Sequence, residues 1–94
     1  MSIGILTLHI RFPNRKSLKN KRSFIKPIIS RLQNEFNLSV AEVGRLDSWK
    51  ESIIACVVVS NSKSHCEQVL QKVKSFTLRS WPDINIIRDD IELL

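Results

Sequence analysis

The stretch IIACVVV, residues Ile53–Val59, decides the fold because it is apolar at every position. A strand of this kind is covered on both of its faces, as the central strands of a packed sheet are. The polar stretch RLDSWKES, residues Arg45–Ser52, precedes it and predicts a hairpin connection. Before that connection, LSVAEVG over Leu38–Gly44 predicts a strand. Asn37 marks the end of the helix expected before this strand.

The N-terminal third predicts a strand followed by a helix. Over residues 3–12, alternate side chains share one apolar face, namely those of Leu6, Leu8, Ile10 and Phe12. Ser17 is a candidate N-cap for a helix to about Phe36, which carries an apolar stripe at helical spacing. Pro27 lies inside this pattern and leaves two alternatives. We favour a helix kinked at Pro27 over a turn before a helix that begins near Lys26.

A second helix and a last strand complete the chain. Ser62 or Ser64 can cap the helix, and Ser64 with Glu67 has the spacing of a capping box. The apolar stripe of this helix extends to about Arg79, and Ile84–Leu94 predicts a strand with imperfect alternation. The order of elements is therefore β-α-β-β-α-β.

This order predicts an α+β fold, a single ferredoxin-like domain over residues 1–94 with a four-stranded antiparallel sheet and two helices on one face. The first and third strands are expected at the centre of the sheet. Because Ile53–Val59 is apolar on both sides, the open sheet face is expected to be partly apolar. A homodimer that covers this face is the simplest consequence.

Positive charge is concentrated in the first third of the chain. The first 34 residues hold eight Lys and Arg and no acid, whereas the rest hold seven Lys and Arg and nine acids. The start of the chain does not resemble a signal peptide, and the longest apolar run is too short for a membrane span. Cys56 and Cys66 are expected to be reduced core residues. We therefore expect a cytoplasmic protein.

The basic stretch Arg11–Arg31 is the main candidate for function. On a helix from Ser17, Lys21 falls within the apolar stripe and other cations line its flank. Cations near a helix start oppose the helix dipole, yet they add charge to free N–H groups that favour an anion. The expected contacts are with phosphates of RNA or of a ribosomal particle, through Arg11, Arg15, Lys16, Lys19, Arg22 and Lys26. The alternative is a solvated basic face that serves solubility alone.

The sheet itself is not expected to read base sequence. RNA-binding domains of this topology stack bases on aromatic residues of the central strands. Here the open face is expected to show Thr7 and His9 from the first strand, and aliphatic side chains with Cys56 from the third. In the hairpin connection, Trp49 and Asp47 are weaker candidates for contact with a partner. The alternative is that Trp49 folds back over the core or a dimer interface.

Four motifs resemble the YlxP-like family of small bacterial proteins. They are SLKNKR at residues 17–22, NLSVAEVG at 37–44, Asp47 with Trp49, and VVSN at 58–61, in matching order over essentially the whole chain. The resemblance implies the ferredoxin-like fold and implies little about activity. Genes of this family often lie beside those for translation initiation and ribosome maturation factors, which implies an RNA or ribosome setting.

No catalytic site, metal site or cofactor is predicted. His65 adjoins Cys66, but no third ligand is spaced to complete a metal site. The remote alternative is an acylphosphatase-like hydrolase, which has a similar fold and holds phosphate in a loop after the first strand. The loop here, FPNRKS, lacks the glycines that let backbone amides wrap a phosphate. We therefore expect a non-catalytic binding module.

Overall fold

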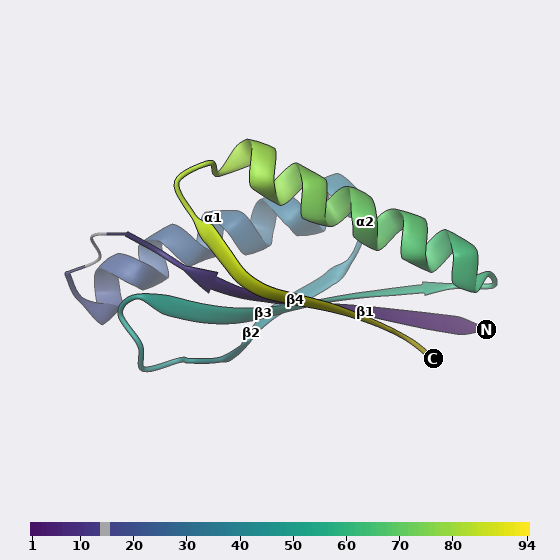
Figure 1. Ribbon diagram of the computed structural model, residues 1–94, viewed down its shortest axis with the longest axis horizontal. Coiled ribbons are helices and arrows are strands. Elements are labelled where there is room, and N and C mark those ends of the chain that lie inside the picture. The colour runs from purple at the N-terminus through teal and green to yellow at the C-terminus, as the bar shows by residue number, and fades with distance from the viewer. Residues whose placement is uncertain (14–15) are drawn as a thin grey trace.

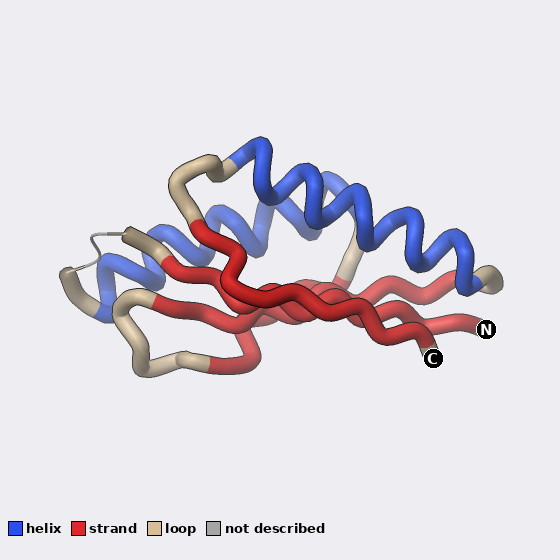
Figure 2. The backbone as a smooth tube through the Cα atoms, in the orientation of Figure 1, coloured by secondary structure: helices blue, strands red, loops and turns tan. Residues whose placement is uncertain are grey.

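The computed structural model describes residues 1–13 and 16–94, and this part of the chain forms four strands and two helices. They are β1 (Ser2–Arg11), α1 (Leu18–Phe36), β2 (Ser39–Gly44), β3 (Glu51–Ser60), α2 (Lys63–Ser80) and β4 (Asn85–Leu93). The strands form one layer, and both helices lie on the same side of it (Figure 1 and Figure 2). The ferredoxin-like α+β sandwich predicted from the order of elements is confirmed.

The strand order in the sheet is β2-β3-β1-β4, and every pairing is antiparallel. β1 and β3 are therefore the central strands, as expected. Their register places Arg11 at the end of β1 opposite Glu51 at the start of β3. The register of the β2–β3 pairing shifts between Glu42 and Gly44, and the register of the β1–β4 pairing shifts between His9 and Ile10.

The core lies between the sheet and the helices. It takes the alternate side chains of β1 from Leu6 to Ile10 and that of Phe12 just after the strand, as the alternation predicts, together with apolar residues of both helices. α2 packs closely against Gly4 of β1, where a Cβ would lie 2.9 Å from Cδ1 of Leu70 and 3.1 Å from Cβ of Cys66. The absence of a side chain at Gly4 thus allows α2 to approach the sheet.

α1 continues through Pro27 without a break, so the alternative of a helix that begins near Lys26 is wrong. Pro27 lies on the exposed side, where the backbone carbonyl that it leaves unbonded can reach water. Ser17 is the N-cap, and its Oγ accepts a hydrogen bond from the backbone N–H of Asn20 at 3.0 Å. Asn37 ends the helix in the left-handed conformation, with φ of 52°.

The N-cap of α2 is Ser62 and not Ser64. Ser62 is extended, and its Oγ accepts a hydrogen bond from the backbone N–H of His65 at 3.2 Å. Ser64 is already inside the helix, which begins at Lys63. The capping-box spacing of Ser64 and Glu67 therefore does not mark the helix start.

The sheet face away from the helices carries half-buried aliphatic side chains of β3, namely Ile53, Ala55 and Val57. This agrees with the partly apolar face expected from the sequence. The expectation that Cys56 lies on this face is wrong, because Cys56 is fully buried in the core opposite Leu6. In a strand that is apolar throughout, composition does not say which alternate set faces the helices. Both cysteines are free and buried, as predicted.

Candidate functional site

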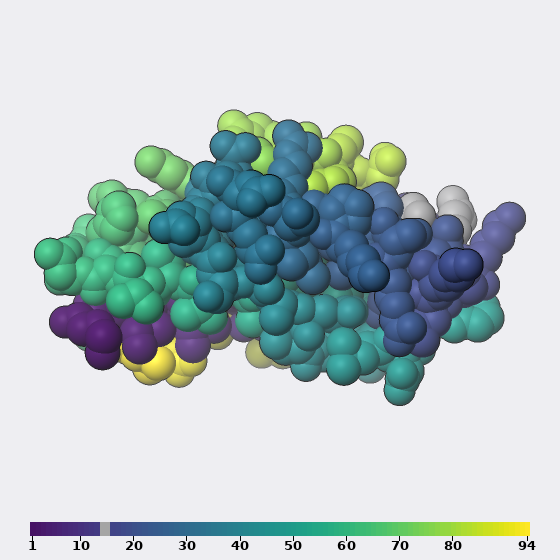
Figure 3. All heavy atoms as spheres, turned by 180° about the vertical axis from the view of Figure 1, so that it is seen from behind, coloured from purple at the N-terminus to yellow at the C-terminus, as the bar shows by residue number. Residues whose placement is uncertain are grey.

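One end of the molecule brings together the end of β1, the start of α1 and the β2–β3 hairpin (residues 45–50), as Figure 1 shows. The backbone N–H of Phe12 donates to the carbonyl oxygen of Lys50 at 2.7 Å, which holds the hairpin beside the chain leaving β1. Seen from behind in Figure 3, the first turns of α1 lie next to the hairpin. We term the exposed cations here the basic end; its described members are Arg11, Lys16, Lys19, Arg22, Lys26, Arg45 and Lys50.

Lys21 of α1 fastens the hairpin to the helix. Its buried ammonium donates to the backbone carbonyl oxygens of Arg45 at 2.8 Å and of Glu51 at 3.0 Å. It also lies 3.0 Å from Oε2 of Glu42, which accepts a further hydrogen bond from the hydroxyl of Ser52 at 2.7 Å. An ammonium has three donors, and each has a partner here, which offsets the cost of burying the charge. Lys21 is therefore structural, as its place in the apolar stripe indicated.

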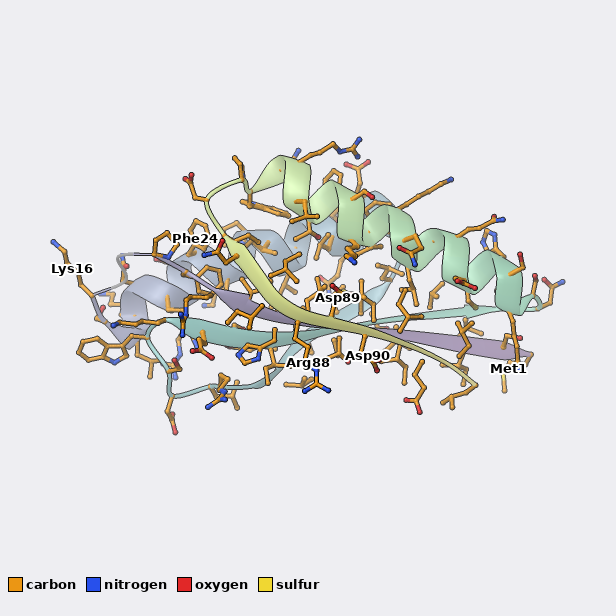
Figure 4. The ribbon with its side chains drawn as sticks, in the orientation of Figure 1. Met1, Lys16, Phe24, Arg88, Asp89 and Asp90 are labelled. Carbon is orange, nitrogen blue, oxygen red and sulfur yellow. The ribbon has the colours of Figure 1, made fainter. Side chains whose placement is uncertain are left out.

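Lys19, Arg22 and Lys26 lie along one exposed strip of α1, because residues three and four apart share a face. Within the described residues, none of the three has an ion pair, and neither has Lys16. Figure 4 shows Lys16 projecting away from the body of the molecule. The first turn of α1 contains no acid. The strip thus offers cations beside the helix start without a neighbouring carboxylate on the helix to compete for them.

Glu51 gathers three basic side chains at the same end of the open sheet face. Its Oε1 lies 2.6 Å from Nε2 of His9, and its Oε2 accepts a hydrogen bond from Nη2 of Arg11 at 3.1 Å. Nε of Arg45 lies 3.8 Å from Oε1. The hydrogen bonds with His9 and Arg11 hold the pKa of Glu51 below its ordinary value of 4.5, against the opposing effect of burial. Arg11 is therefore already paired, unlike the exposed Lys19, Arg22 and Lys26 of α1, which have no ion pair within the described residues.

The sequence did not predict the Glu51 cluster. Strand alternation places His9 and Arg11 on one face, which was recognised. Their contact with Glu51 depends on the register between β1 and β3, which sets Arg11 opposite Glu51. The same hairpin brings Arg45 and Lys50 to the basic end, and neither was among the predicted site residues.

The structure places the remaining predicted residues as follows. Arg15 lies outside the described residues. Asp47 and Trp49 are exposed in the hairpin at the basic end. Trp49 is 52% exposed and does not belong to the core cluster, so it does not fold back over the core, while its place in a dimer interface stays a prediction.

A shallow hollow of about 360 Å³ lies on the open sheet face, lined by Thr7, His9, Ile53, Arg88, Asp89 and Asp90. Asp89 is engaged elsewhere, 3.1 Å from Nζ of Lys74 on α2. Figure 4 shows Arg88 and Asp90 on the side of β4 away from the helices, and Asp89 on the side of the helices. Among the described residues there is no group of three His, Cys, Asp or Glu that could hold a metal ion. Neither described helix is long and apolar enough to cross a membrane.

Comparison with known proteins identifies the family. The profile described as "Protein of unknown function (DUF503)" matches residues 3–91. This chain belongs to that family. It is similar to Uncharacterized protein YlxP of Bacillus subtilis, with 41% identity over 68 residues, which cover 72% of this chain and 73% of that protein. The YlxP-like resemblance seen in the four motifs is thereby confirmed.

Two designed proteins are similar in structure. De novo designed protein Foldit4 matches with a TM-score of 0.53 at 12% identity, over 100% of this chain and 97% of that one. This similarity concerns the fold alone. De novo designed protein LFR1 1, with ferredoxin fold, has a TM-score of 0.45 at 5% identity, over 100% of this chain and 83% of that one.

Proposed function

We propose that this protein is a small, non-catalytic binding module of the cytoplasm that associates with RNA, in free or ribosomal form, through its basic end. The observation that carries the proposal is the set of exposed cations that form no ion pair within the described residues, namely Lys16, Lys19, Arg22 and Lys26, around a helix start. They belong to a stretch of 34 residues that contains no acid. Solubility alone does not require cations to be gathered in one place.

Phosphate is the chemical group that this arrangement suits. Contacts to phosphates fix the position of a nucleic acid without reading its sequence. Because the open sheet face of the described residues carries no Phe, Tyr or Trp side chain, base readout on the sheet is not expected. Binding is therefore expected to depend on salt and little on base sequence. The free, buried cysteines support a reducing compartment such as the cytoplasm.

The test compares two double charge reversals. Lys19→Glu with Arg22→Glu is expected to weaken binding to ribosomal RNA fragments. The slope of log affinity against log salt concentration should also become shallower by about 1.4, because each lost phosphate contact on a single strand contributes about 0.7. Lys63→Glu with Lys72→Glu on α2 changes the net charge equally and serves as the control. Binding left intact by the first pair, or lost equally in both, would refute a role for the basic end.

A second candidate function is self-association through the open sheet face. The half-buried aliphatic side chains of β3 favour it, because apolar surface in the middle of a sheet is stabilised when covered. Arg88 and Asp90 carry opposite charges two residues apart on β4 and pair with β1 residues of that face. In a two-fold dimer, Arg88 of one copy can face Asp90 of the other.

Sedimentation equilibrium tests this second function. Val57→Glu places a carboxylate on the open face and is expected to convert a dimer into monomers. Leu78→Glu places the same charge on the exposed side of α2 and should leave the dimer intact. A wild-type protein that is monomeric at high concentration would exclude the dimer.

A further inference from the structure

Trp49 is the one aromatic residue of the described chain that does not pack in or against the core. All six aromatic residues of the chain lie in its described part. Phe12 is buried, and the other four pack against the core, namely Phe24, Phe36, Phe76 and Trp81. Trp49 is half-exposed, and no ring contact to it is found within the described residues. A tryptophan left in water in this way marks a contact surface, since its large apolar ring is stabilised when covered.

The hairpin holds Trp49 in a defined place. The backbone N–H of Ser48 donates to the carbonyl of Arg45 at 3.0 Å, and Oγ of Ser48 accepts from the backbone N–H of Glu51 at 3.1 Å. Lys21 binds the backbone carbonyls of Arg45 and Glu51, one at each end of the turn. Trp49 therefore sits on a turn closed by hydrogen bonds on both sides and anchored to α1. Little backbone entropy therefore remains to be lost when a ligand covers its ring.

The hairpin that carries Trp49 also carries cations. Lys50 follows it directly, Arg45 begins the same turn, and both are exposed. The first turns of α1, which carry Lys19 and Arg22, lie next to this hairpin (Figure 3), and Lys21 of the same helix binds it. An exposed aromatic ring among cations is how proteins bind single-stranded nucleic acid, because bases stack on the ring while the cations hold phosphates.

We propose that Trp49 stacks on an unpaired base of RNA whose neighbouring phosphates contact the basic end. This inference rests on the proposed function and specifies its substrate as a single strand or a loop. Bases within a duplex are already stacked on one another and offer no free face to a side chain. Stacking accepts any base, so the preference is for unpaired structure and not for a sequence.

Affinity measurements with two RNAs of equal length test the inference, one an oligouridine strand and the other a blunt duplex. Trp49→Ala is expected to weaken binding of the single strand about tenfold and to leave duplex binding and its salt dependence unchanged. Trp49→Phe retains a ring and should recover most of the loss. In a Trp81→Phe background, Trp49 is the sole tryptophan, and its fluorescence is expected to be quenched by oligouridine.

The charge reversal Lys19→Glu with Arg22→Glu separates this inference from the proposed function, because it is expected to weaken both RNAs. If Trp49→Ala binds oligouridine as tightly as the wild type while the charge reversal weakens both RNAs, the stacking role is wrong and RNA binding stands. If the charge reversal changes neither RNA, the proposed function fails and the stacking role with it. If Trp49→Ala only dissociates a dimer, Trp49 is a protein contact and the inference is overturned.

Discussion

Replacing Lys21 with methionine tests how much the contacts between its ammonium and the hairpin stabilise the fold. Methionine keeps most of the apolar stem and removes both hydrogen bonds and the ion pair with Glu42. Breaking a buried ion pair by removing one partner costs about 3–5 kcal/mol. Glu42 is 14% exposed and keeps the hydrogen bond from Ser52, so the lower end applies, about 3 kcal/mol. For a domain of this size the expected loss in melting temperature is about 12–24 °C, at about 4–8 °C per kcal/mol.

Urea unfolding and thermal melts followed by circular dichroism give the measurement. Lys19→Met, on the exposed strip of the same helix, is the matched control and should change stability by no more than about 0.5 kcal/mol. Lys21→Met combined with Glu42→Met removes both charges and is expected to recover part of the loss, while the carbonyls of Arg45 and Glu51 remain without their donor. A cost below about 1 kcal/mol for Lys21→Met, or no recovery in the double variant, would refute the reasoning.

Three further predictions concern single side chains. The hydrogen bond with His9 lowers the pKa of Glu51 in the folded state, so the ionised carboxylate stabilises the fold above pH 4.5. This contribution is lost as the pH falls through the lowered pKa. Glu51→Gln should therefore make the free energy of unfolding fall less steeply as the pH is lowered. Burial raises the pKa of Cys56 to about 12, so a thiol reagent at pH 8 should modify Cys56 only as fast as the protein unfolds, and immediate modification would contradict its burial. Asp47→Asn removes an exposed carboxylate beside the basic end and should tighten RNA binding about twofold at low salt, with no gain at high salt.

Local patterns in the sequence were sufficient for the fold. Alternation from Leu6 to Phe12 identified the core face of β1, and Ser17 and Asn37 marked both ends of α1. These signals depend on residues close together in the chain, where geometry is fixed by strand and helix periods. Order of elements and handedness of the crossovers then left few topologies.

The site was less predictable because it depends on pairing between distant segments. The apolar stripe of a single helix was enough to predict that Lys19 is exposed and that Lys21 is buried. The ion pair between Arg11 and Glu51 joins residues 40 positions apart, and no local pattern indicates it. Cys56 was assigned to the wrong face because the strand around it is apolar throughout, so only its pairing with Leu6 shows where it points.

The position of β1 in the sheet has a consequence for the growing chain. Of the four strands of the sheet β1 is made before the others, yet its two neighbours are β3 and β4, which end at residues 60 and 93. Until those segments leave the ribosome, both edges of a strongly apolar strand lack their partners, a state prone to association with other chains. The pairing of Gly4 with Leu93 closes nearly the whole chain into one loop. The native sheet therefore forms only once synthesis has passed β4, by long-range pairings that are slow to form.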